Sequence, residues 1–128
     1  MLDQVLDFFD IVPDFDLNLM KPNQNLHNLT SNIIELLKPV FDEFKPHYSF
    51  VHGDTTTTMA ASISSFYSGV KVCHVEAGLR TNNKLSPYPE EINRQITSRI
   101  CDYHFAPTQT SKNNLVKENI SKDSILVT

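Results

Sequence analysis

Two polar runs in this chain each follow an apolar segment, and each places an acidic residue where that segment ends. HGDTTTT at 52–58 follows YSFV and contains Asp54, and HVEAGLR at 74–80 follows VKVC and contains Glu76. Short apolar runs that lead into helical patterns are typical of strands in an open parallel α/β sheet, and ligands bind at the carboxyl edge of such a sheet. The pattern therefore predicts two carboxylates at one sheet edge.

A third acidic site opens the next helical pattern. Glu90 and Glu91 follow the proline-rich segment 86–89, and acidic residues in the first turn of a helix are favoured by the helix dipole. Arg94 lies four residues after Glu90, a spacing typical of an ion pair on a helix surface. These local effects explain both glutamates, but three acidic sites converging on one edge also indicate a reaction centre.

The rest of the chain alternates helical and extended patterns. Apolar residues recur at helical spacing from Leu26 to Phe44, although Pro39 interrupts them. The sequence of the segment 10–25 predicts a loop that contains a short extended piece at 15–19. We expect further helices at 1–9, 55–68, 89–101 and 109–118, and strands at 48–52, 70–75, 103–106 and 124–127. This alternation predicts an α/β fold, a Rossmann-like parallel sheet with helices on both faces.

Composition limits the classes of function. A chain of 128 residues with 40% hydrophobic content fits one domain with a core. A net charge of −4 and a pI of 5.6 argue against nucleic-acid binding, and no apolar run reaches the ~20 residues of a membrane span. Asp3, Asp7 and Asp10 are unlike a secretory signal. Cys73 and Cys101 form no CxxC pair, so reduced thiols of a cytosolic protein are expected.

The spacing of glycines and histidines supports neither a dinucleotide site nor a metal site. The chain has three glycines, too dispersed for a GxGxxG motif. His52 and His74 each lie two residues before an acidic residue, but no third cluster supplies further ligands. We therefore expect no cofactor and no metal.

Four blocks, in this order and spacing, resemble a known family: VHGDTTTT, HVEAGLRT, SPYPEEINRQ and HFAPT, at 51–58, 74–81, 86–95 and 104–108. They resemble the non-hydrolysing UDP-N-acetylglucosamine 2-epimerase family, and the similarity covers essentially the whole chain. Members of that family are two-domain, GT-B-like enzymes. The resemblance implies that residues 1–128 are a single partial domain, the N-terminal Rossmann-like domain without its first strand and without the second domain.

The resemblance also implies an activity and the residues that perform it. The family interconverts UDP-N-acetylglucosamine (UDP-GlcNAc) and UDP-N-acetylmannosamine (UDP-ManNAc) by elimination and re-addition of UDP, for polysaccharide biosynthesis. Carried over residue by residue, the match assigns catalysis to Asp54, Glu76 and Glu90, and substrate binding to Thr55, Thr56, His74 and Arg80. Glu91 is left with a structural role. A homodimeric full-length protein in the cytoplasm, acting on a UDP-sugar, is implied as well.

Other interpretations of these residues stay open. Asp54 is a good N-cap for the next helix, and if it is catalytic, a threonine must do the capping. The threonines at 55–58 suit plain helix initiation or contact with a phosphate or sugar hydroxyl equally well. Glu76 is costly to bury without a partner, and Arg80 or Lys71 could supply one.

Two other classes of function compete with the epimerase. One is a GT-B glycosyltransferase or hydrolysing epimerase, which would use the same fold with a different fate for the intermediate. The other is an inactive truncated remnant that serves only as an interaction module. Because a two-domain cleft needs both of its walls, residues 1–128 alone are expected to be inactive.

Overall fold

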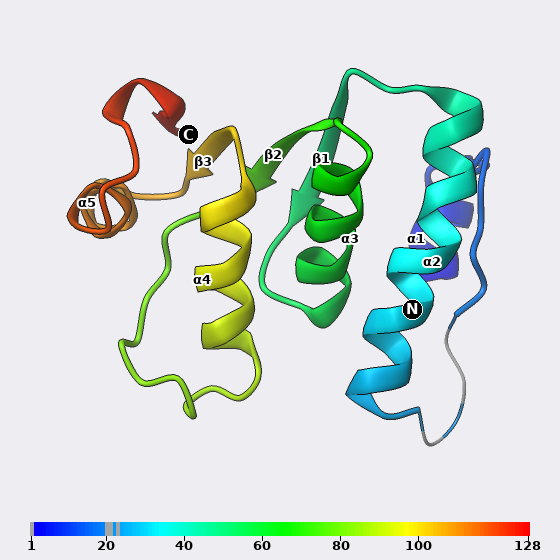
Figure 1. The fold of residues 1–128 in the computed structure, drawn as a ribbon, viewed down its shortest axis with the longest axis horizontal. Helices are drawn as coiled ribbons and strands as arrows, with labels where there is room; N and C mark the ends of the chain where they lie inside the picture. The colour runs from blue at the N-terminus through cyan, green and yellow to red at the C-terminus, as the bar shows by residue number, and fades with distance from the viewer. Residues whose placement is uncertain (1, 20–21, 23) are drawn as a thin grey trace.

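A four-stranded parallel sheet forms the centre of the molecule (Figure 1). The computed structural model describes residues 2–19, 22 and 24–128. Strands β1 (Tyr48–His52), β2 (Lys71–Val75), β3 (Tyr103–Ala106) and β4 (Ile125–Val127) lie in the order β1-β2-β3-β4. They are joined by α3 (Thr56–Tyr67), α4 (Glu90–Ile100) and α5 (Gln109–Lys117), with a short 3-10 turn η1 (Lys122–Ser124) before β4. The predicted Rossmann-like α/β fold is confirmed.

Two further helices precede the sheet. Helix α1 (Leu2–Phe8) leads into a segment without a hydrogen-bonded strand at 11–19, where the sequence predicts a short extended piece. Helix α2 (Leu26–Phe44) packs beside α3 and runs through Pro39 without a break. The side chain of Asn25 accepts a hydrogen bond from the N–H of Asn28 and caps its start. Among the described residues no helix is long and apolar enough to cross a membrane.

The two faces of the sheet differ in their cover. One face carries the buried residues Val51, Val72, His74, His104, Ala106 and Ile125, and helices α3, α4 and α5 contact the strands there. The other face carries aromatic side chains, of which Phe50 is 67% exposed and stacks on Phe105 with 6.2 Å between ring centroids. Helices therefore cover the first face as predicted. On the second face, within the described residues, Phe50 is exposed while its neighbour Cys73 is buried.

Candidate functional site

The three predicted carboxylates lie at the carboxyl ends of β1 and β2 and at the start of α4. The ladder continues beyond the strands, because the N–H of Gly53 donates to the carbonyl of Val75 at 3.0 Å. The exits of β1 and β2 therefore adjoin. A Cβ atom built on Gly53 would lie 3.4 Å from Oε2 of Glu76, so the Glu76 carboxylate lies beside the β1 exit.

Asp54 is held by a cation from α4. Oδ2 of Asp54 accepts hydrogen bonds from Nε of Arg94 at 3.1 Å and from Nη2 at 2.6 Å. The carbonyl of Asp54 accepts a third from Nδ2 of Asn93 at 2.9 Å. Glu90 lies three and four residues before these two side chains, a spacing that puts it on the same face of α4. The N-terminal half of α4 thus faces the exit of β1.

The interpretation of Asp54 as a helix N-cap is wrong. Thr55 caps α3, since its Oγ1 accepts from the N–H of Thr58 at 3.2 Å. Oγ1 of Thr58 donates in turn to the carbonyl of His52 at 2.6 Å. Thr56 is the first residue of α3 and is buried. Capping by a threonine leaves the carboxylate of Asp54 free to face Arg94.

Glu76 is positioned mainly by its backbone. Its φ of 68° is in the left-handed region, which is uncommon for a residue with a side chain and is found preferentially at functional sites. Its side chain is 46% exposed, and Oε2 lies 3.5 Å from Nε2 of His52. The two partners suggested by the sequence, Arg80 and Lys71, are both wrong. Nζ of Lys71 instead lies 5.9 Å from the ring centroid of Tyr48.

Arg80 is committed to another part of the molecule. Its Nε and Nη2 donate to the carboxylate of Glu118 at 2.7 and 2.9 Å, and Nη2 also donates to Oγ of Ser98. The Arg80 side chain is 1% exposed. In this structure the Arg80 guanidinium therefore stays apart from the three carboxylates.

His74 is buried between the two strand exits. Its Nε2 lies 2.7 Å from the carbonyl oxygen of Gly53. Burial lowers the pKa of His74 to about 4, although the bond to Gly53 partly offsets this effect. A neutral ring that donates to Gly53 supports the β1 exit. In the part of the chain that the structure describes, no group of three or more His, Cys, Asp or Glu side chains could hold a metal ion.

Glu90 and Glu91 have opposite environments. Glu91 is completely buried, and its carboxylate accepts from the N–H groups of Thr81 and Asn82 at 3.0 and 3.1 Å. It also accepts from Arg94 and Gln95 at 3.1 and 3.0 Å. Burial raises the pKa of Glu91, but these hydrogen bonds lower it by more. Glu91 thus has the structural role expected of it.

Glu90 is half-buried and, among the described residues, makes no hydrogen bond or ion pair. The surface pair predicted between Glu90 and Arg94 is wrong, because Arg94 binds Asp54 and Glu91 instead. Glu90, in the first turn of α4, is therefore a carboxylate without a structural partner in the described part of the chain. No local spacing reveals the contact between Arg94 and Asp54, since the two residues are 40 positions apart.

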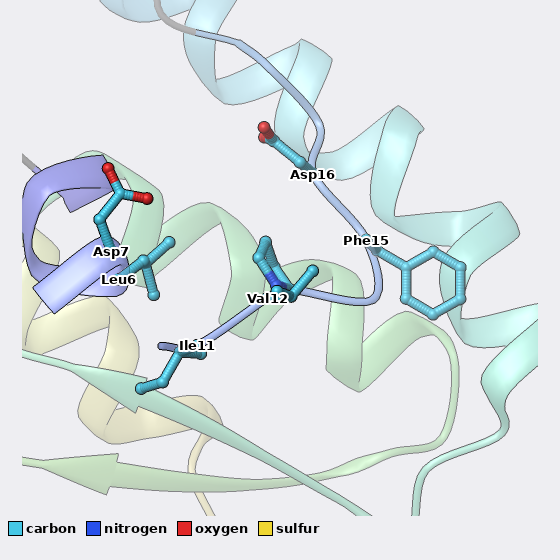
Figure 2. A pocket seen from close by; sticks show the side chains of 7 residues that line it. Leu6, Asp7, Ile11, Val12, Phe15 and Asp16 are labelled. Atoms are coloured by element: carbon cyan, nitrogen blue, oxygen red, sulfur yellow. The ribbon is translucent and has the colours of Figure 1, made fainter. Parts of the chain in front are cut away.

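The pocket in Figure 2 is separate from this group. It has a volume of about 380 Å³ and is lined by Leu6, Asp7, Ile11, Val12, Pro13, Phe15 and Asp16. The first two belong to α1 and the others to the segment that follows. None of the three candidate carboxylates lines it.

Comparisons with known proteins cover the whole chain. The family model described as UDP-N-acetylglucosamine 2-epimerase matches residues 1–128. The UDP-N-acetylglucosamine 2-epimerases of Bacillus subtilis and Neisseria meningitidis are 59% and 57% identical over all 128 residues. The chain spans 34% of the length of each of these curated relatives.

Solved structures agree with the fold. The crystal structure of UDP-GlcNAc 2-epimerase from Neisseria meningitidis bound to UDP-GlcNAc is similar with a TM-score of 0.95 at 57% identity, over 100% of this chain and 35% of that one. The Methanocaldococcus jannaschii enzyme in complex with UDP-GlcNAc and UDP gives 0.88 at 34% identity, over 95% and 33%. The similarity to both structures therefore extends over nearly all of the present chain.

Proposed function

The chain belongs to the UDP-N-acetylglucosamine 2-epimerase family, and we propose that the full-length protein is an isomerase that interconverts UDP-GlcNAc and UDP-ManNAc without net hydrolysis. The observation that supports this proposal is that Asp54 and Glu76 follow adjoining strand exits and that α4, which begins with Glu90, binds Asp54 through Arg94. Relatives of more than 50% identity bear the epimerase name. One relative of known structure is described as bound to UDP-GlcNAc, which supports a UDP-sugar as the substrate.

The chemistry needs carboxylates in different environments. The C2–H bond of the sugar is not acidic, so direct removal and return of its proton is unfavourable. Elimination of UDP gives a glycal, and re-addition of UDP with protonation from the other face inverts C2. This route requires a base on one side and an acid on the other, and anions stabilise positive charge that forms at the anomeric carbon.

The three carboxylates divide these tasks by their contacts. Asp54 is paired with Arg94 through Oδ2, and this ion pair fixes the position of the Asp54 carboxylate. Glu76 is exposed beside His52, and Glu90 makes no ion pair with any residue that the structure describes. Glu76 and Glu90 are the two groups free to exchange a proton with the sugar. The proposed substrate-binding residues remain Thr55, Thr56, His74 and Arg80. Of these, His74 and Arg80 would act indirectly, because His74 binds the carbonyl of Gly53 and Arg80 binds Glu118.

Other parts of the proposal depend on residues outside this chain. We propose that the remaining contacts to the nucleotide come from a second domain of a GT-B-like protein, and this chain spans 34% of the length of the curated relatives. We expect residues 1–128 alone to be inactive, because catalysis needs both walls of the cleft. A homodimeric assembly and a cytoplasmic location are part of the same proposal.

The proposal is tested by incubating the purified full-length protein with UDP-GlcNAc and following both epimers by NMR. Approach to the same equilibrium from either epimer supports it. Release of free sugar with stoichiometric UDP would indicate a hydrolysing relative, and sugar transfer to an acceptor would indicate a glycosyltransferase. No turnover by folded protein would indicate an inactive remnant.

A further inference from the structure

Arg94 joins two acidic residues that belong to different parts of the chain. It binds Oδ2 of Asp54, at the exit of β1, through two nitrogens at 3.1 and 2.6 Å. Its third nitrogen, Nη1, donates to Oε2 of Glu91 at 3.1 Å. A planar guanidinium that uses all three nitrogens in this way has a fixed orientation.

Glu91 extends this link to the loop that follows β2. The same carboxylate accepts from the N–H groups of Thr81 and Asn82. A continuous path of hydrogen bonds therefore runs from the loop at 81–82, through Glu91 and Arg94, to Asp54. The path therefore begins in the loop that follows the β2 exit and ends at Asp54, beyond the β1 exit.

The burial of the three side chains makes this link rigid. Glu91 is fully buried, and the side chain of Arg94 is 12% exposed. Asp54 is 31% exposed, and within the described residues its side-chain hydrogen bonds all go to Oδ2. Burial lowers the pKa of Arg94, but its bonds to Asp54 and Glu91 raise it by more, so the guanidinium keeps its charge.

We propose that Arg94 is a positioning residue, which holds Oδ2 of Asp54 so that Oδ1 is presented to the sugar and ties that orientation to the 81–82 loop through Glu91. This inference rests on the proposed epimerase function. Arg94 itself touches no reacting atom. Its loss should therefore lower kcat through misplacement of Asp54 and leave the affinity for UDP-GlcNAc nearly unchanged.

The test compares Arg94→Met and Arg94→Lys with Arg99→Met in the full-length protein. Arg99 lies on the same helix, is exposed, and makes no hydrogen bond or ion pair among the described residues. We expect Arg94→Met to lower kcat on the order of 100-fold, the effect of a displacement of about 1 Å, with little change in KM. Arg94→Lys, which keeps the charge but reaches one acid at a time, should recover part of kcat, and Arg99→Met should match the wild type.

A double-mutant cycle separates positioning from general stability. In an Asp54→Asn background, Arg94→Met should cause no further loss of kcat, because the group that it positions is already disabled. An equal additional loss would overturn the inference, and so would an Arg94→Met variant with wild-type kcat.

A second readout does not depend on activity. If wild-type protein shows no epimerisation, the proposed function fails, and the same cycle is then measured on the melting temperature. Strong non-additivity between Arg94→Met and Asp54→Asn supports the positioning contact, whereas additive shifts overturn it.

Discussion

The exits of β1 and β2 each present a carboxylate, but the protein fixes the two by different means. Asp54 is fixed through its side chain, which binds Arg94 from α4. Glu76 is fixed through its backbone, which has a left-handed φ, and among the described residues only His52 lies within ion-pair distance of its carboxylate. The comparison shows that one sheet edge can hold one acid rigidly by an ion pair and leave its neighbour exposed. The two exits should therefore respond to different substitutions.

The largest expected effect concerns Glu90, which is held by neither of these means. Glu90→Gln should lower kcat by about 10² to 10⁴ because an amide cannot transfer the proton, and the melting temperature should stay unchanged. Steady-state kinetics of the full-length protein would measure it. Glu35→Gln, a change of the same kind at an exposed site on α2, is the control. Wild-type turnover in Glu90→Gln would remove Glu90 from the site.

The backbone at the β2 exit should be sensitive to Gly78→Ala. Gly78 has a φ of 90°, and a Cβ atom there would lie 2.3 Å from the carbonyl oxygen of Ser111. We expect a loss of about 3 kcal/mol in the free energy of unfolding, from steric overlap and left-handed strain. Denaturant unfolding would measure it.

Gly69→Ala is the matched control for this steric effect. Gly69 has a φ of 70°, but nothing lies within 4 Å of an added Cβ, so only the strain of about 1 kcal/mol is expected. Equal losses at the two glycines would show that the contact with Ser111 does not constrain the loop.

The side-chain link at the β1 exit should be sensitive to Glu91→Gln. Replacing the carboxylate with an amide removes the negative charge. It also turns an NH2 group toward N–H groups that donate hydrogen bonds to Glu91 in the wild-type protein. A loss of about 2 kcal/mol in the free energy of unfolding is expected. Glu90→Gln, one residue away, should cost much less. A stability difference near zero between these neighbours would contradict the structural role of Glu91.

Mild acid should weaken the contact between the two exits. The pKa of His74 is lowered to about 4 by burial, so the unfolded chain binds the proton more readily. The stabilising contribution is complete above the ordinary pKa of 6.5 and is lost as the pH falls from there toward 4. Between pH 7 and pH 5 the loss should be about 1–2 kcal/mol.

Melting temperatures across that range would measure the effect of His74. His74→Gln should flatten the profile, and His47→Gln, at an exposed histidine, should leave it unchanged. An unaltered slope in His74→Gln would show that another group is responsible.

Local patterns predict the elements of this fold well. The strands expected at 48–52 and 103–106 agree with β1 and β3, and the other elements differ by one residue or so at their ends. Gly69 follows the end of α3 with a positive φ, as a C-terminal capping glycine should. These features depend on residues that are close together in the sequence, so the sequence alone is sufficient to predict the element boundaries and the capping glycine.

Contacts between distant segments are where prediction from the sequence fails. Arg94 was expected to pair with Glu90 at helical spacing, but the structure gives it Asp54, which lies 40 residues away. Arg80 likewise binds Glu118 instead of Glu76. In both cases a local partner was available, and the tertiary partner is preferred because the fold brings a half-buried carboxylate within bidentate or bridging reach of a largely buried guanidinium. Spacing along one chain does not contain that information.

The proposed mechanism requires carboxylates at this edge to remove the C2 proton of a UDP-sugar and to return a proton from the other face. The most direct measurement is incubation of the full-length protein with UDP-GlcNAc in deuterated water, with NMR of the recovered sugars. We expect UDP-ManNAc that carries deuterium at C2, and recovered UDP-GlcNAc labelled at the same carbon. Epimerised product that retains the original hydrogen would contradict elimination and re-addition, and with it the role assigned to the three carboxylates.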